Sequence, residues 1–363
     1  MSQTRTIRWG VIGTGNISQN FARGLAFADN AKLSAVLSRS KANAEAFAAS
    51  YGPGAKAYDD AQAFFAAADV DAVYIGTPNH RHATDAIAAI DAGKAVLVEK
   101  PFALNADEAQ RVVDRAKAKG VFCMEAMWMR FLPLVREAHR IAAGGDLGEV
   151  TFLTADFSVP TIYEAGSHFT DPAKGGGALM DRGVYCLSLA DYLFGEPVET
   201  QSIATRGPTG VDVQAAVTLR YASGLVAQVW TSIVTKGTNS ATIHGTKGTL
   251  TLHEPFYRPH RLSIGKVQAY SMTAPGKPAA PSLKSKIKEN KFVQKVGRKL
   301  QSILKRSRVD RIQPFAGNGY SFEADEVARC LRAGLTESDT MPHAATVRVM
   351  RLMDDIRAKW HVV

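Results

Sequence analysis

A short glycine turn near the start of the chain has the residue types needed to hold a phosphate. Gly13-Thr14-Gly15-Asn16-Ile17-Ser18 follows the β-rich run Ile7–Ile12 and precedes an apolar helical pattern. Gly13 permits a tight turn, Gly15 lets a pyrophosphate approach the backbone, and the helix aims its free N–H groups at the phosphates. Ser18 replaces the usual third glycine, and ordinary glycine turns are common, so this motif alone is a weak signal.

A second polar cluster, Ser38-Arg39-Ser40-Lys41, follows the next apolar run, Lys32–Leu37. In an NAD enzyme this strand usually ends in Asp or Glu, which binds the ribose hydroxyls and repels a 2′-phosphate. Here two hydroxyls and two cations would instead hold a dianionic phosphate through charge-assisted hydrogen bonds. The cluster favours NADP over NAD as cofactor, and the alternative is an ordinary basic surface loop.

Regularly alternating elements would position these turns. Strands are expected at Lys32–Leu37, Asp71–Ile75, Ala95–Val98 and Val121–Met124, with helices at Lys41–Ser50, His82–Ala92 and Ala106–Lys119. This alternation predicts an α/β Rossmann domain with a parallel sheet over residues 1–124. Ligands bind at the carboxyl ends of such strands, where Thr77-Pro78-Asn79-His80 and Glu99-Lys100-Pro101 stand.

Residues 125–363 have the pattern of an α+β domain with a large, mostly antiparallel open sheet. Strands are expected at Val211–Tyr221, Leu225–Val234 and Asn239–His244, and terminal helices at Phe315–Gly334 and Ala344–Trp360. The alternation from Val226 to Ile233 leaves one sheet face less polar than a solvated sheet needs.

Taken together, Gly13–Ile17, Thr77-Pro78-Asn79-His80-Arg81-His82 and Glu99–Pro101 resemble the Gfo/Idh/MocA oxidoreductase family. Met124–Pro133 and Gly175–Cys186 look like the branch of dimeric dihydrodiol dehydrogenase, glucose–fructose oxidoreductase and NADP-dependent xylose dehydrogenases. The resemblance spans nearly the whole chain, except a basic insertion at about 276–314. Members of the family pair their open sheet faces, which implies a homodimer or homotetramer.

The resemblance also implies where the site residues lie. Lys100 and Tyr185 would sit at the nicotinamide with Asp181 beside them. Trp128 comes directly after the sixth strand, where we expect it to wall the cleft and offer a surface on which a sugar ring stacks; the alternative is a core residue. Besides the two phosphate-binding turns, the expected cofactor contacts are Thr77, Pro78, Asn79, His82, Glu99, Lys100 and Arg130.

The chemistry of the three catalytic candidates agrees with this placement. A phenol with a pKa near 10 is a poor base at pH 7 unless a cation such as Lys100 stabilises its phenolate. If a helix begins at Asp181, then Asp181 and Tyr185 share one face, and Asp181 can orient the substrate or Lys100. The alternatives are a surface lysine, a helix N-cap and a core tyrosine.

The leading hypothesis is an NADP(H)-dependent enzyme that oxidises a ring hydroxyl of a cyclic sugar or diol, or reduces the matching carbonyl. A second is an enzyme that keeps and internally recycles its nucleotide, as epimerases and some glycosidases do. A third is a non-catalytic nucleotide-sensing or membrane-associated regulator, against which the presence of Lys100, Asp181 and Tyr185 argues.

Composition limits the other classes of protein. The chain has 363 residues, of which 46% are hydrophobic and 21% charged, enough for two domains with real cores. No apolar run approaches the 18 or so residues of a membrane span, so we expect a cytoplasmic protein. His80 and His82 lack further residues at metal-ligand spacing, and Cys123, Cys186 and Cys330 lack a C-x-x-C pattern, so we expect buried thiols and no metal.

Positive charge is concentrated in one segment. The net charge of the chain is +10, and Leu283–Arg311 holds eleven Lys or Arg against two acidic residues. Phe292–Leu304 separates apolar and basic residues as an amphipathic helix would. We expect it to pack on its own domain or a partner subunit; a weak membrane-surface contact through 283–306 is the alternative. No nucleic-acid motif is present.

The cofactor preference can be measured directly. NADPH should bind the purified, cofactor-stripped protein at least about tenfold more tightly than NADH, a difference of about 1.4 kcal/mol, because only NADPH offers the 2′-phosphate. Fluorescence titration with both nucleotides measures the two affinities. Equal or reversed affinities would contradict the interpretation of Arg39.

Overall fold

Six parallel strands form the predicted Rossmann sheet, in the order β3-β2-β1-β4-β5-β6. They are β1 (Ile7–Ile12), β2 (Ala31–Leu37), β3 (Lys56–Tyr58), β4 (Ala72–Ile75), β5 (Ala95–Glu99) and β6 (Cys123–Ala126). The connecting helices are α1 (Asn16–Leu25), α2 (Lys41–Tyr51), α3 (Ala61–Phe65), α4 (His82–Asp91) and α5 (Ala106–Lys119), with a 3₁₀ turn η1 (Asn79–Arg81) before α4. The predicted alternation is confirmed, and β6 begins two residues later than expected.

The computed structural model describes residues 5–66, 69–162, 164, 166–267 and 308–360. The amphipathic helix expected at Phe292–Leu304, and most of the insertion at 276–314, lie outside these residues. Within them, no helix is long and apolar enough to cross a bilayer. The three cysteines are buried free thiols, as expected.

The central strands of the Rossmann sheet are buried along their whole length. Every residue of β4 and β5 is buried, because helices cover both faces of this parallel sheet. The two strands therefore carry continuous apolar runs instead of an alternating pattern.

A close approach between α1 and the end of β4 fixes the first glycine turn. The Ser18 hydroxyl donates to the Gly76 carbonyl at 3.4 Å, and a Cβ added to Gly76 would lie 2.2 Å from Ser18 Oγ. Gly13 has φ +93°, and a Cβ there would lie 2.8 Å from the Gly76 carbonyl oxygen. The close contact between α1 and the end of β4 needs a glycine on one side only. Gly76 provides it at the end of β4, so α1 can carry a serine where the motif usually has its third glycine.

Eight strands form a second sheet, in the order β14-β13-β12-β11-β7-β10-β9-β8. They are β7 (Val150–Ser158), β8 (Glu199–Arg206), β9 (Asp212–Arg220), β10 (Val226–Ser232), β11 (Ala241–Gly245), β12 (Gly248–Leu252), β13 (Arg261–Lys266) and β14 (Arg308–Ile312). Neighbouring strands are antiparallel except β7 and β10. The predicted large, mostly antiparallel sheet is confirmed.

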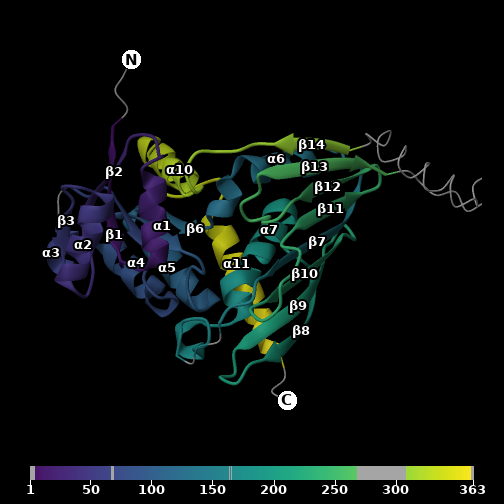
Figure 1. Ribbon diagram of the computed structural model, residues 1–363, viewed down its shortest axis with the longest axis horizontal. Coiled ribbons are helices and arrows are strands. Elements are labelled where there is room, and N and C mark those ends of the chain that lie inside the picture. The colour runs from purple at the N-terminus through teal and green to yellow at the C-terminus, as the bar shows by residue number, and fades with distance from the viewer. Residues whose placement is uncertain (1–4, 67–68, 163, 165, 268–307, 361–363) are drawn as a thin grey trace, which may run out of the picture.

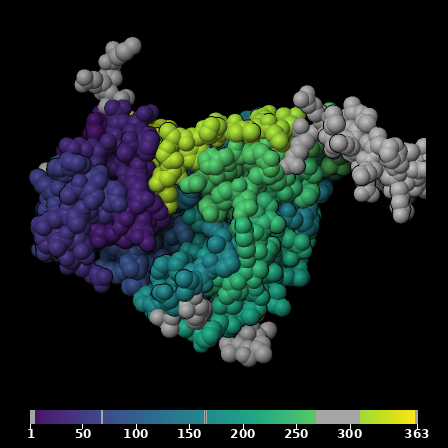
Figure 2. All heavy atoms as spheres, in the orientation of Figure 1, coloured from purple at the N-terminus to yellow at the C-terminus, as the bar shows by residue number. Residues whose placement is uncertain are grey.

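Helices lie between the second sheet and the Rossmann domain (Figure 1). They are α6 (Pro133–Ala143), α7 (Val184–Phe194) and α11 (His343–Ala358), while α10 (Ser321–Arg332) packs against α1. Short turns η2 (Trp128–Phe131), η3 (Pro172–Lys174) and η4 (Leu179–Gly183) join these helices to their neighbours. In Figure 2 the surface is hollowed between the purple Rossmann domain and the green sheet domain.

The outer face of the second sheet carries exposed apolar side chains, as the alternation predicted. Ile203, Ala216 and Trp230 pair laterally across β8, β9 and β10, so they share this face. The exposed fractions of Ile203 and Trp230 are 73% and 37%. No helix of the described chain covers this side of the sheet in Figure 1.

The contact between Ser18 and Gly76 can be tested by a double-mutant cycle. Gly76→Ala should lower the free energy of unfolding by about 1–3 kcal/mol, because the new methyl group overlaps Ser18. The same substitution in a Ser18→Gly background should cost at least about 0.5 kcal/mol less. Urea unfolding of the four proteins measures the coupling, and strictly additive effects would contradict the contact.

Candidate active site

Lys100 directly follows β5, and its largely enclosed side chain is aimed at the second domain. Its Nζ donates to the backbone carbonyl of Asp181 at 2.9 Å and to the Asp181 carboxylate at 3.1 Å. The Lys100 side chain is 12% exposed. Burial alone would lower the pKa of Lys100, but Asp181, Tyr185 and Glu99 outweigh it and raise the pKa above its usual value. Lys100 is therefore a fixed positive charge at neutral pH.

Asp181 and Tyr185 reach Lys100 from adjoining turns. Asp181 lies in η4, a single π-helical turn, and Tyr185 lies in the first turn of α7. The Asp181 N–H donates to the carbonyl of Gly177, whose φ is +121°. Lys100 Nζ lies 5.0 Å from the centre of the Tyr185 ring. The three predicted catalytic residues are thus brought together, although the helix expected at Asp181 opens with a π turn.

The Tyr185 hydroxyl lies in an aromatic pocket. The indole N–H of Trp128 donates to it at 3.0 Å, and the rings of Phe157 and Tyr257 lie 5.4 and 5.6 Å from the Tyr185 ring. Burial raises the pKa of Tyr185 above its usual value, and the Lys100 charge only partly offsets this. Tyr185 therefore holds its proton at neutral pH.

Glu99, expected among the cofactor contacts, lies beneath the site instead. It is 3% exposed, accepts a hydrogen bond from the Tyr74 hydroxyl at 2.5 Å and accepts another from the Lys100 backbone N–H at 3.0 Å. Burial raises its pKa to about 7. Because alternate residues of a strand face opposite sides, Glu99 points into the sheet's packing and supports the strand end that carries Lys100.

The first glycine turn fits a pyrophosphate. Gly15 caps α1 without a side-chain hydrogen bond, and a Cβ at Gly15 would meet no atom within 4 Å. Gly15 and Asn16 are exposed and Ile17 half-buried, so the first N–H groups of α1 face open space. The Thr14 hydroxyl lies 3.4 Å from that of Ser38, which joins this turn to the second cluster.

In the second polar cluster, Ser40 and Lys41 bind neighbouring backbone groups, whereas Arg39 is exposed. Ser40 caps α2 by accepting from the Asn43 N–H, and the Lys41 ammonium donates to the Ala57 carbonyl at 2.5 Å. Arg39 is exposed. Of the two cations expected at a 2′-phosphate, Arg39 extends outward and Lys41 is tied to β3.

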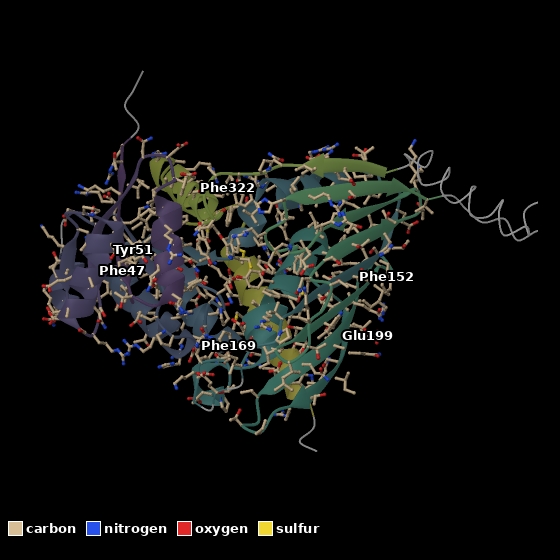
Figure 3. The ribbon with its side chains drawn as sticks, in the orientation of Figure 1. Phe47, Tyr51, Phe152, Phe169, Glu199 and Phe322 are labelled. Carbon is tan, nitrogen blue, oxygen red and sulfur yellow. The ribbon has the colours of Figure 1, made fainter. Side chains whose placement is uncertain are left out.

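The loop that follows β4 is held by α4 and by a loop of the second domain. The Thr77 hydroxyl donates to Asp85 at 2.8 Å, and the Asn79 amide donates to the Gly175 carbonyl at 3.3 Å. Pro78 is exposed between them. Segment 166–175, where Phe169 is labelled in Figure 3, lies beside this loop.

His82, also expected to contact the cofactor, is 1% exposed. Its ring nitrogens lie 2.8 Å from the carbonyls of Thr77 and Pro101, and burial lowers the pKa of His82. The side chain is enclosed by the loops that follow β4 and β5, so it positions them instead of facing the site.

Arg130 and Trp128 also differ from expectation. Arg130 is 1% exposed and donates to Ser188 and to the Asp191 carboxylate at 3.0 Å, away from the glycine turns. Trp128 is 5% exposed and stacks on Tyr320 at 4.8 Å, which leaves little surface for the sugar ring expected there. Both side chains face inward because η2 turns them toward α7 and α10.

Sequence reasoning missed several residues around the Tyr185 pocket, namely Phe157, Arg182, Tyr257 and Tyr320. Arg182 is 8% exposed and lies 3.5 Å from the Asp181 carboxylate. Arg182 could have been found from the sequence, because it directly follows Asp181. The three aromatic residues come from distant segments that carry no motif. Among the residues described, no three His, Cys, Asp or Glu side chains form a group that could hold a metal.

The fold and site define a dinucleotide-dependent oxidoreductase: a Rossmann domain whose strand ends face a second domain across a buried lysine. Comparison with known families agrees. Residues 7–127 match the model of the oxidoreductase family with an NAD-binding Rossmann fold, and residues 135–251 match the Gfo/Idh/MocA C-terminal domain. The chain belongs to the Gfo/Idh/MocA family and is an NAD(P)-dependent oxidoreductase that acts on CH–OH groups.

Similar proteins cover nearly the whole chain. It is 31% identical over 358 residues to the trans-1,2-dihydrobenzene-1,2-diol dehydrogenase of Bos taurus, covering 97% of this chain and 96% of that protein. The enzyme of Oryctolagus cuniculus is 32% identical, over 89% and 88%. A 3-ketoreductase from Actinomadura kijaniata, solved with NADP and TDP-benzene, shares the fold with a TM-score of 0.79, 22% identity and 98% coverage of both chains.

Replacing Arg130 separates its structural role from a role in cofactor binding. Arg130→Met should lower the free energy of unfolding by about 3 kcal/mol or more, because it removes one partner of a buried ion pair. NADPH affinity of the folded variant should stay within about twofold. Denaturant unfolding and fluorescence titration measure the two effects.

The matched control is Arg348→Met, since Arg348 also binds Asp191 at 2.6 Å but is 30% exposed. It should cost less stability than Arg130→Met. If the Arg130→Met protein is stable but binds NADPH tenfold more weakly, Arg130 contributes to cofactor binding and the prediction is wrong.

Proposed function

We propose that this enzyme exchanges hydride between NADP(H) and a ring hydroxyl or carbonyl of a cyclic sugar or diol, with Tyr185 as the proton donor or acceptor. The observation that carries the proposal is the meeting of Lys100, Asp181 and Tyr185 at the carboxyl end of β5. Alcohol oxidation and ketone reduction both need one proton moved at the reacting oxygen, and these residues can move it.

The substrate class rests on the relatives' names. The curated relatives are diol dehydrogenases, and structural neighbours include the aldose-aldose oxidoreductase of Caulobacter crescentus, with a TM-score of 0.78 and 22% identity. Sugars and diols share adjacent hydroxyl groups on a ring. The aromatic wall of Phe157 and Tyr257, stacked at 4.2 Å, suits the apolar face of such a ring.

The chain's own residues fit the cofactor. The open turn at Gly13–Ile17 would hold the pyrophosphate, and Ser38 with Arg39 would contact the 2′-phosphate. The reduced nicotinamide supplies the hydride when bound. These residues support NADP over NAD, because the end of β2 carries no carboxylate to repel the 2′-phosphate.

Protonation states favour Tyr185 as an acid. Because burial raises its pKa, Tyr185 arrives protonated and can donate to the substrate oxygen during reduction. The Lys100 ammonium then stabilises the phenolate that remains. Asp181 holds the Lys100 ammonium in place, so removal of Asp181 would release Lys100 from the site.

We further propose a homodimer or homotetramer formed through the outer face of β8–β10, in a cytoplasmic protein. The lateral row Ile203, Ala216 and Trp230 supports a contact between copies, because apolar side chains gathered on one sheet face are stabilised when buried. The possible membrane contact through 283–306 falls outside the described residues.

Tyr185→Phe tests the proposed chemistry. It should lower kcat by about 10²-fold or more, because the phenol is the group that exchanges the proton. NADPH affinity should remain nearly unchanged. Steady-state kinetics with a panel of cyclic sugars and diols, together with nucleotide titration, give both quantities.

The matched control is Tyr221→Phe. Tyr221 is 4% exposed, and its hydroxyl has no hydrogen-bond partner in the described part of the chain, so the variant should keep full kcat. An unchanged kcat in Tyr185→Phe would remove Tyr185 from the mechanism.

A further inference from the structure

Trp128 contacts the catalytic phenol through its only polar atom. Its indole Nε1–H donates to the Tyr185 oxygen at 3.0 Å, and both residues are buried, with exposed fractions of 5% and 6%. The two residues come from different elements, η2 and α7, so this bond joins the end of the Rossmann domain to the catalytic helix.

The direction of this hydrogen bond restricts the phenol proton. An indole N–H can only donate, whereas a phenol can both donate and accept. With Trp128 donating to the oxygen, the hydroxyl hydrogen of Tyr185 cannot point at Trp128 and must face another acceptor. Lys100 Nζ lies over the same ring and is itself only a donor. Within the described residues, the Trp128 N–H is the group that hydrogen-bonds the Tyr185 hydroxyl, which leaves the proton for an incoming oxygen.

Packing holds the indole in this orientation. Tyr320 stacks on Trp128 with ring centres 4.8 Å apart and planes 14° apart, and Tyr257 meets it edge-on at 6.4 Å. Gly319 has φ +99°, and a Cβ there would lie 3.0 Å from Trp128 Cζ3. Tyr320 leads into α10, whose Phe322 is labelled in Figure 3. Gly319 and Tyr320, which lie far from Trp128 in the sequence, therefore hold the indole ring in place.

We propose that Trp128 is a positioning residue for proton transfer by Tyr185. In the reduction, the O–H bond of Tyr185 would break and an O–H bond would form on the substrate oxygen; the reduced nicotinamide, when bound, would supply the hydride that the carbonyl carbon needs. The Trp128 N–H keeps the hydroxyl aimed at the substrate and then stabilises the phenolate by a charge-assisted bond. Solvent returns the proton to Tyr185. This inference rests on the proposed function.

The hydrogen bond itself can be observed without cofactor or substrate. The chain has four tryptophans, so its ¹H–¹⁵N spectrum has four indole signals, and Trp128→Phe identifies one of them. Tyr185→Phe should move the Trp128 indole proton upfield, because its acceptor is gone. The Trp360 indole, which donates to Ser202 at 3.1 Å, is the internal control and should not move. An unmoved Trp128 signal would overturn the proposal.

The kinetic test replaces only the N–H. Trp128→benzothienylalanine keeps the shape of the indole and exchanges its N–H for sulfur, so it preserves the packing that Trp128→Phe can disturb. Its kcat should fall by about tenfold or more, with KM changed by less than about threefold, because the bond matters most when the phenolate forms. An unchanged kcat would overturn the proposal.

The double variant distinguishes this inference from the proposed function. In a Tyr185→Phe background, the Trp128 replacement should cost no further activity, since Trp128 acts through Tyr185. Full additivity would instead make Trp128 an independent binding residue and overturn the proposal. If Tyr185→Phe alone leaves kcat unchanged, the proposed function fails; if only the Trp128 variant is fully active, this inference fails alone.

Discussion

The partly buried ion pair of Lys100 and Asp181 is the constraint on which the site depends. A lysine at the end of a fully buried strand loses most of its hydration, and its charge is tolerated only with a close partner. Asp181 supplies that partner from 81 residues away, with both its carboxylate and its backbone carbonyl. The second domain must therefore present η4 to the end of β5, which brings Tyr185 with it. The same contact that neutralises Lys100 brings the three residues of the candidate site together.

Support for this pair is layered beneath the cleft. Glu99 binds the Lys100 backbone N–H from below and is held by Tyr74, while His82 joins the loops that follow β4 and β5. Buried polar groups of this kind are stable when each finds a partner, and they then fix one geometry. The residues that sequence assigned to the cofactor thus split into two sets: exposed groups at the turns, and buried groups that hold the turns in place.

How well the sequence predicts a structural feature depends on how far apart in the sequence the interacting residues lie. The parallel sheet, the glycine turn at Gly13 and the place of Lys100 directly after β5 follow from local patterns that the chain carries in order. The short β3 has three residues, too few for a periodic signal. The partners of Trp128 and Arg130 lie 57 and 61 residues away, and nothing in their neighbourhood indicates which way they face. Both side chains are buried, and an arginine or a tryptophan serves equally well in a cleft or in its supporting wall, so residue type alone does not decide between the two.

The two strands that flank the basic insertion pair with each other. Gly265 of β13 pairs with Arg308 of β14, so the chain leaves and re-enters the sheet at neighbouring positions, as in a hairpin. A connection closed at its base can change in length or charge without altering the strands' register. Beyond β14, however, the chain runs to Tyr320, which stacks on Trp128. The two strands that flank the insertion therefore meet at neighbouring positions, and the segment after the second of them leads to Tyr320, which packs on the hydrogen-bond donor to Tyr185.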